Sequence, residues 1–281
     1  MLRFGIYGLI CETVDELPDM IYGYACHHMQ QFIQSLTNYT WYRSYMFMSD
    51  SGFLAAGSQA RYRTILRNVY MWMAVGLSLT AVVAWWASQS PAVRQVMFGN
   101  GRLPFFVLAI GTFVLVVVLS RNIMKMSVTA AMGGFALYAV LNGFLMSFIF
   151  LAYTNTVIFQ AFAVSAGMFG VMSLWAVTTK RDLSGWGHYL FMGLIGLIIA
   201  GLVGMFIGGA AYNFLYSAAG VVLFTALTAY DTQMIKKMSD QASANAGEDD
   251  FIRLSIIGAL KLYLDFINMF LFLLRIFGRR R

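Results

Sequence analysis

Seven long apolar stretches constrain the fold of this 281-residue chain more than any other feature of its sequence. Each is close to the roughly 20 residues that an α-helix needs to cross a bilayer. They lie at residues 69–87, 103–119, 128–152, 157–177, 189–209, 214–235 and 256–277. They are apolar all round, without the alternation of a membrane β-barrel. The sequence therefore predicts an all-α fold, a polytopic bundle of seven transmembrane helices.

The composition excludes a soluble globular protein. Hydrophobic residues make up 60% of the chain and charged residues only 11%, which leaves too little polar surface for a soluble protein of this length. The net charge of +7 fits basic residues gathered in cytoplasmic loops. No compact basic patch with interleaved aromatic residues is present, so we expect no nucleic-acid partner.

The charges of the connecting loops predict the orientation. On the side of the membrane opposite the segment before the first helix, the loops that precede the last helix contain only Arg94 and Arg102 as basic residues. The side that includes the segment before the first helix receives Arg61, Arg63, Arg67, Arg121, Lys125, Lys180, Arg181, Lys236, Lys237 and Arg253. This bias predicts a cytoplasmic amino terminus. A full crossing by the last helix places the arginines at 279–281 outside, against the rule; a re-entrant helix is the alternative, and we favour the full crossing.

The first 60 residues differ from the rest, so we divide the chain into a leader at 1–60 and a membrane domain at 61–281. Acidic residues follow the short apolar run near the amino terminus, where a secretory signal has small residues. Cys26, His27 and His28 lack the paired spacing of a zinc site. We expect this leader to be poorly ordered, or to reflect a translation start assigned too early.

Two acidic residues, Asp231 and Asp265, occupy the last two apolar stretches. A charged side chain in hydrocarbon costs several kcal/mol unless it has a partner or a water-filled cavity, so such residues are candidate functional sites. A purely structural role is the alternative. Tyr230, Thr232, Tyr263 and Asn268 stand close by in sequence as possible hydrogen-bond partners.

The sequence around these acids resembles one known family. The motifs are Tyr230-Asp231-Thr232-Gln233, the segment at 258–268 that contains Asp265, the segment at 274–278, and the connector at 178–184. Over about residues 60–281 the chain resembles the Bax inhibitor-1 family, in particular its bacterial inner-membrane branch. The resemblance implies a seven-helix bundle with the last helix at the centre. It also implies a pH-sensitive calcium leak in which Asp231 and Asp265 share a proton, or a role in inhibiting membrane proteases or cell death.

The chemistry of two neighbouring carboxylates agrees with that mechanism. In a low-dielectric site two carboxylates do not both ionise cheaply, so we expect them to hold one proton between them. When both are ionised they repel each other and offer oxygen ligands to a hard cation such as Ca²⁺. Asp231 and Asp265 are therefore the predicted pH sensor and transient calcium ligands. Calcium is expected as the transported ion, and no resident cofactor is expected.

Two basic residues are candidate modulators of the site. Lys261 precedes Asp265 by four residues on one helix face, where it could neutralise the acid. Arg121 follows the second apolar stretch, where some relatives place a basic residue against the aspartate of the sixth helix; a role as a cytoplasmic anchor is the alternative. For Asp231 and Asp265 to lie at the same depth in the membrane, a helix must be tilted or the sixth helix must continue beyond Lys237.

Two function classes remain open at this point. The first is a proton-gated calcium leak in the bacterial inner membrane, which works with the lipid bilayer, protons and Ca²⁺. The second is an interaction protein whose acidic loop, Glu248-Asp249-Asp250, binds a membrane protease or another partner. No nucleophile and base pair is recognisable in the sequence, so an enzyme is not expected.

Overall fold

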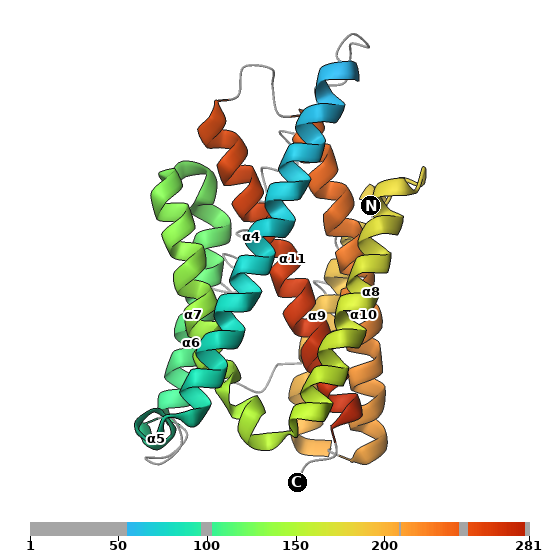
Figure 1. The fold of residues 1–281 in the computed structure, drawn as a ribbon. Coiled ribbons are helices and arrows are strands. Elements are labelled where there is room, and N and C mark those ends of the chain that lie inside the picture. The colour runs from blue at the N-terminus through green and yellow to red at the C-terminus, as the bar shows by residue number, and fades with distance from the viewer. Residues whose placement is uncertain (1–54, 97–102, 208, 242–246, 279–281) are drawn as a thin grey trace, which may run out of the picture. The chain divides into compact units, whose positions relative to one another are not determined.

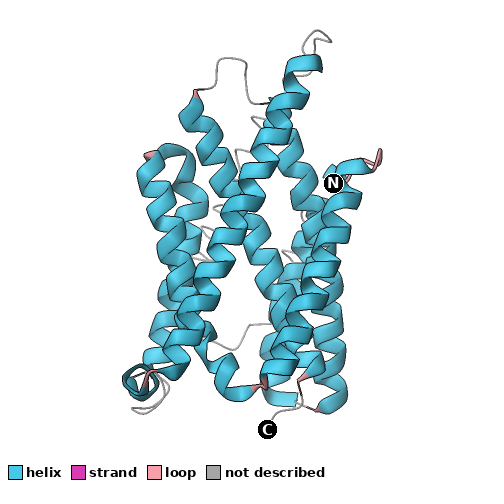
Figure 2. Ribbon diagram, viewed as in Figure 1, coloured by secondary structure: helices cyan, strands magenta, loops and turns pink. Residues whose placement is uncertain are grey.

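The computed structural model describes residues 55–96, 103–207, 209–241 and 247–278, all within one compact unit, Leu54–Arg281 (Figure 1). Every regular element in these residues is a helix (Figure 2). The elements are α4 (Ala55–Gln89), α5 (Pro91–Arg94), α6 (Leu103–Asn122), η2 (Ile123–Lys125), α7 (Val128–Ala152), α8 (Asn155–Thr178), η3 (Ser184–Trp186), α9 (Gly187–Ile207), α10 (Ala210–Gln241) and α11 (Glu248–Phe277). The predicted all-α fold is confirmed.

Seven of these helices are long and apolar enough to cross a membrane, and they coincide with the seven apolar stretches. Short breaks separate them, such as Ser127 and Thr154, whose hydroxyl groups accept hydrogen bonds from the backbone of the first turns of α7 and α8. The predicted leader lies outside the described residues, except that α4 already begins at Ala55. The protein is an integral membrane protein with seven spans.

Two of the helices extend well beyond their apolar stretches. α10 continues beyond Lys237 to Gln241, which is one of the two alternatives for equal depth of the two acids, and α11 begins at Glu248 rather than near residue 256. Acidic side chains in the first turn of α11 interact favourably with the positive end of the helix dipole. Arg253 forms ion pairs with Asp249 and Asp250, and its Nε donates to the backbone oxygen of Met126 at 2.8 Å. These contacts allow the helix to begin outside the apolar region.

The last helix, α11, is the central one. Its apolar window is 72% buried, against 44% or less for each of the other six spans. It packs against α4, α7, α8 and α10. In Figure 1 it runs through the middle of the bundle, with α6 and α7 on one side and α8, α9 and α10 on the other. The central position that the family resemblance implies is confirmed.

The seven spans alternate in direction. α11 starts at the end of the bundle where α4 starts and finishes at the opposite end, as Figure 1 shows. It is one continuous helix of 30 residues, which at about 1.5 Å per residue exceeds the thickness of a hydrocarbon core. The geometry is that of a full crossing, which the sequence favoured over a re-entrant segment.

Close packing of α4 against α7 depends on a glycine. A Cβ atom at Gly143 would lie 2.8 Å from the Cβ of Val83 and 2.9 Å from the backbone oxygen of Thr80. Small residues allow membrane helices to approach in this way. Just beside this contact, Tyr263 of α11 joins the hydroxyl of Thr80 at 2.7 Å and accepts from the Asn142 amide at 3.0 Å. The buried polar groups of three helices are thereby satisfied together.

Candidate functional site

Asp231 and Lys261 form an ion pair between α10 and α11. Lys261 Nζ lies 3.3 Å from Asp231 Oδ1, and the side chains are 30% and 13% exposed. Two charges removed this far from water need each other, because an unpaired charge in such surroundings costs several kcal/mol. The sequence suggested that Lys261 could neutralise Asp265 within its own helix. In the structure its ion pair is with Asp231, across the helix interface.

Asp265 lies on the same face of α11, one turn beyond Lys261. That face follows the helical spacing of three and four residues and consists of Gly258, Lys261, Asp265, Met269 and Phe272. It packs on α10 on both sides of Asp265: Lys261 reaches Asp231, and Thr225 Oγ1 donates to Met269 Sδ at 4.0 Å. We call this face and the residues of α10 against it the α10–α11 seam. Asp265 is therefore enclosed in the middle of the seam.

Asp265 is buried, and one of its carboxylate oxygens has no hydrogen-bond partner among the described residues. The residue is 4% exposed, and that oxygen is Oδ2. It interacts electrostatically with Asp231 and with Lys261. Two carboxyl groups and one ammonium group thus lie together in the seam. A buried oxygen without a donor is unusual in a folded protein, which makes Asp265 a candidate functional residue.

Three of the four polar residues proposed as structural partners for the acids, Tyr263, Asn268 and Thr232, form hydrogen bonds with other groups. Tyr263 binds Thr80 and Asn142, and the Asn268 amide donates to the backbone oxygen of Leu264 at 2.8 Å. Thr232 faces Ser173 of α8 at 3.4 Å between the two hydroxyl oxygens. The purely structural interpretation of Asp265 therefore receives no support from these side chains.

Arg121 lies in the exposed last turn of α6. This helix packs against α7 and η2 at the edge of the bundle. The position fits the anchoring role that the sequence analysis considered. A modulating role for Arg121 stays a prediction.

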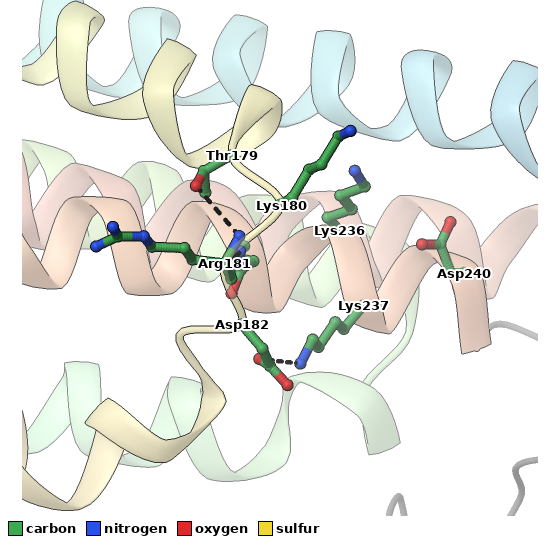
Figure 3. Close-up of a pocket in the computed structure, with 8 residues that line it drawn as sticks. Thr179, Lys180, Arg181, Asp182, Lys236, Lys237 and Asp240 are labelled. Carbon is green, nitrogen blue, oxygen red and sulfur yellow. Dashed lines mark hydrogen bonds and ion pairs between the residues drawn. The ribbon is translucent and has the colours of Figure 1, made fainter.

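The sequence analysis missed a set of contacts that fastens the α8–α9 connector to α10. Gln233 donates from Nε2 to the backbone oxygen of Arg181 at 2.8 Å and accepts at Oε1 from the backbone nitrogen of Leu183 at 2.6 Å. Lys237 donates to Asp182 Oδ1 at 2.6 Å, as Figure 3 shows. It also donates to the hydroxyl of Ser184. The motif residues 178–184 and Gln233 were recognised only as part of a resemblance, because sequence spacing does not reveal a contact across 50 positions.

These contacts perturb the acid of the connector. The hydrogen bond from Lys237, followed by those from Ser184, lowers the pKa of Asp182 from 3.8 to about 2. Asp182 is therefore ionised throughout the physiological range of pH.

The donor set of the seam suits a passing hard cation better than a resident metal. Carboxylate oxygens bind Ca²⁺, which in a stable site takes six to eight oxygen ligands. In the described residues no group of three or more His, Cys, Asp or Glu side chains gathers in one place. Asp231 and Asp265 could offer oxygens to an ion in transit, with Lys261 as a competing cation.

The fold and the seam define a class of protein: a seven-span helical membrane protein with partly or fully buried ionisable residues between its last two helices. A family model described as "Inhibitor of apoptosis-promoting Bax1" matches residues 62–281. The chain belongs to this family, the Bax inhibitor-1 family, which confirms the resemblance.

Curated relatives come from several bacteria. The protein named Inner membrane protein YbhL of Escherichia coli (strain K12) is 48% identical over 223 residues, which cover 79% of this chain and 94% of the relative. An uncharacterized protein of Borreliella burgdorferi is 42% identical over 216 residues, covering 77% of this chain and 92% of the relative. An uncharacterized membrane protein of Streptococcus pyogenes is 38% identical over 213 residues, covering 75% and 91%.

Proposed function

We propose that this protein is a pH-sensitive calcium leak channel of the bacterial inner membrane, gated by Asp231 and Asp265 in the α10–α11 seam. The observation that supports it best is Asp265, buried in the central helix with an unpartnered oxygen beside the Asp231–Lys261 ion pair. The compartment follows the name of the Escherichia coli relative. Calcium is the substrate of this activity.

The proposed gate depends on the balance of charge in the seam. With a proton on Asp265, the seam holds one carboxylate and one ammonium group, and α10 and α11 stay in contact. When the pH rises and the proton leaves, two carboxylates face one ammonium group. The excess negative charge repels within the seam, attracts water and a cation, and loosens the contact between the helices.

Among the described residues, the other long helices that pack on α11 place no further charged side chain near Asp265. The described helices α7 and α8 contain no charged residue. On α4, Arg67 is exposed, and the neighbouring Val69 packs at the level of Gly258, about two turns before Asp265 on α11. The proposed response to pH therefore depends on the three seam residues.

The interaction hypothesis has less support. The acidic first turn of α11 was its predicted binding element, and Asp249 and Asp250 pair with Arg253 of the same helix. A protease partner stays a prediction.

The test is Ca²⁺ flux into liposomes that contain the purified protein, measured between pH 6 and 8. We expect the leak to increase with pH in the wild type, and Asp265→Asn to remove that dependence, because the amide holds no titrating proton. Asp231→Asn should remove it as well, because only one carboxylate then faces Lys261 and loss of the Asp265 proton creates no excess negative charge. Asp182→Asn is the matched control, an acid outside the seam, and should leave the dependence intact.

Two results would count against this proposal. Equal flux at every pH in the wild type would reject pH gating. Equal pH dependence in Asp265→Asn and the wild type, with both proteins folded, would move the sensor away from the seam. In either case the acidic turn of α11 and its partners become the next target.

A further inference from the structure

A basic pocket lies at the end of the bundle where the α8–α9 connector meets the last turns of α10 (Figure 3). Its volume is about 290 Å³, and it is open to the surroundings. Four basic side chains and two acidic side chains line it: Lys180, Arg181, Lys236, Lys237, Asp182 and Asp240. The seam does not include it, and the proposed gate does not use it.

The charges of the pocket are only partly balanced from within. Lys237 and Asp182 pair with each other at 2.6 Å, so their charges offset. Of the remaining lining residues, Asp240 interacts electrostatically with Lys236, and with Lys180 and Arg181 the lining keeps an excess of positive charge. Lys180 and Lys236 extend toward the same side of the pocket in Figure 3. Two ammonium groups on one side of a pocket repel each other, and an anion placed between them removes that repulsion.

Hydrogen bonds fix the backbone of the α8–α9 connector, which forms one wall of the pocket, without any ligand. Gln233 fixes the backbone of the connector through Arg181 and Leu183, at 2.8 and 2.6 Å. Thr179 Oγ1 accepts from the backbone nitrogen of Arg181 at 3.2 Å (Figure 3). The backbone that carries Lys180 and Arg181 is therefore fixed in position, which lowers the entropic cost of binding a ligand.

Aromatic side chains place the pocket at the level of lipid headgroups. Trp175 lies one turn before the end of α8, and Trp186 and Tyr189 follow the connector. All three are exposed: 41%, 55% and 73%. Exposed Trp and Tyr residues at the ends of membrane helices mark the interface between hydrocarbon and water. A pocket beside them is within reach of a headgroup phosphate.

We propose that this pocket binds the phosphate group of an anionic phospholipid, with Lys180 and Lys236 as the main contacts. The leaflet is the one in which this end of the bundle lies. Basic pockets between membrane helices are suited to such headgroups, because each basic residue near an anionic surface contributes attraction. A free phosphate ion offers the same chemistry but lacks the acyl chains that hold a lipid beside the aromatic residues.

Native mass spectrometry of the delipidated full-length protein tests the proposal. The probes are phosphatidylglycerol and phosphatidylcholine with identical acyl chains, titrated separately and in competition with inorganic phosphate. The pocket variant is Lys180→Gln/Lys236→Gln. The matched control is Arg67→Gln/Lys125→Gln, which removes two exposed positive charges from the same end of the bundle, outside the pocket. Thermal unfolding confirms that each variant is folded.

We expect the wild type to prefer phosphatidylglycerol and the pocket variant to bind it about 30-fold more weakly, since two basic residues each contribute about 1 kcal/mol. The control should bind within about twofold of the wild type. Equal losses in both variants would show attraction by net charge alone and overturn the site. Displacement of the lipid by millimolar inorganic phosphate would also overturn it, because the pocket would then be a site for a free anion.

Discussion

Lys261 links the two last helices through an ion pair. Its ammonium group, in the middle of the central helix, pairs with the Asp231 carboxylate of the neighbouring helix at 3.3 Å. One lysine serves a seam that contains two carboxyl groups, since Asp265 also interacts with it electrostatically. The seam therefore carries a balance of charge that a single proton can change.

Replacing Lys261 by Met should destabilise the protein by about 1–3 kcal/mol, because Asp231 is left as a poorly hydrated charge without a partner. The double variant Lys261→Met/Asp231→Asn should recover most of that loss. Thermal unfolding in detergent at neutral pH measures both. If the double variant is no more stable than Lys261→Met alone, the ion pair is not what Lys261 contributes.

The contribution of Asp182 to stability should change with pH only in strong acid. Its pKa falls from 3.8 to about 2 on folding, so its contribution is present above pH 3.8 and disappears as the pH drops through about 2. The melting temperatures of Asp182→Asn and the wild type should therefore differ by a constant amount between pH 6 and 8 and converge near pH 2. A difference that changes between pH 6 and 8 would contradict this assignment.

At the scale of elements, the contacts between helices decide where the polar groups meet. α11 lies among four other helices and meets α10 along the seam and α4 and α7 at Tyr263. The hydrogen bonds of Tyr263 with Thr80 and Asn142 require α4 and α7 to approach closely beside it. Gly143 provides that approach.

Gly143→Ala should cost about 1–3 kcal/mol, because the added methyl group would overlap Val83 and the backbone of Thr80. Gly133→Ala is the control on the same helix, since a Cβ there meets nothing within 4 Å. It should be neutral or slightly stabilising, because alanine favours a helix over glycine. Equal thermal stability of the two variants would show that α4 and α7 can separate without cost.

At the scale of the whole molecule, the alternating helices place the loops rich in basic residues at one end of the bundle and the loops poor in them at the other. Lys125 ends η2, at the end of the bundle where α4 begins, and Asn155 begins α8 at the other end (Figure 1). Both residues are exposed. The bias of basic residues predicts that the first of these ends faces the cytoplasm.

A membrane-impermeant maleimide tests that orientation in intact spheroplasts. With Cys11 and Cys26 replaced by serine, Asn155→Cys should react from outside, and Lys125→Cys should react only after the membrane is opened. The reversed pattern would invert the topology, and with it the leaflet proposed for the lipid pocket.

The number of spans and the helical class follow from the sequence because hydrocarbon leaves few choices. Backbone groups in a bilayer must bond within their own segment, so an apolar stretch of about 20 residues is a helix wherever it packs. The candidate acids could be found in the same way, since Asp231 and Asp265 are conspicuous in apolar surroundings. The longer α10 was one of two alternatives that the sequence offered for equal depth of the two acids, the other being a tilted helix.

The partners of those residues were decided by tertiary structure alone. Lys261 sits at the right spacing for Asp265, yet its ion pair is with Asp231, 30 positions away on another helix. Gln233 and Lys237 likewise fasten a connector about 50 positions before them. Local spacing determines which face a side chain occupies, whereas the rotation and register of one helix against another determine what that face meets. Those depend on packing between helices, such as the approach allowed by Gly143, and no single segment contains that information.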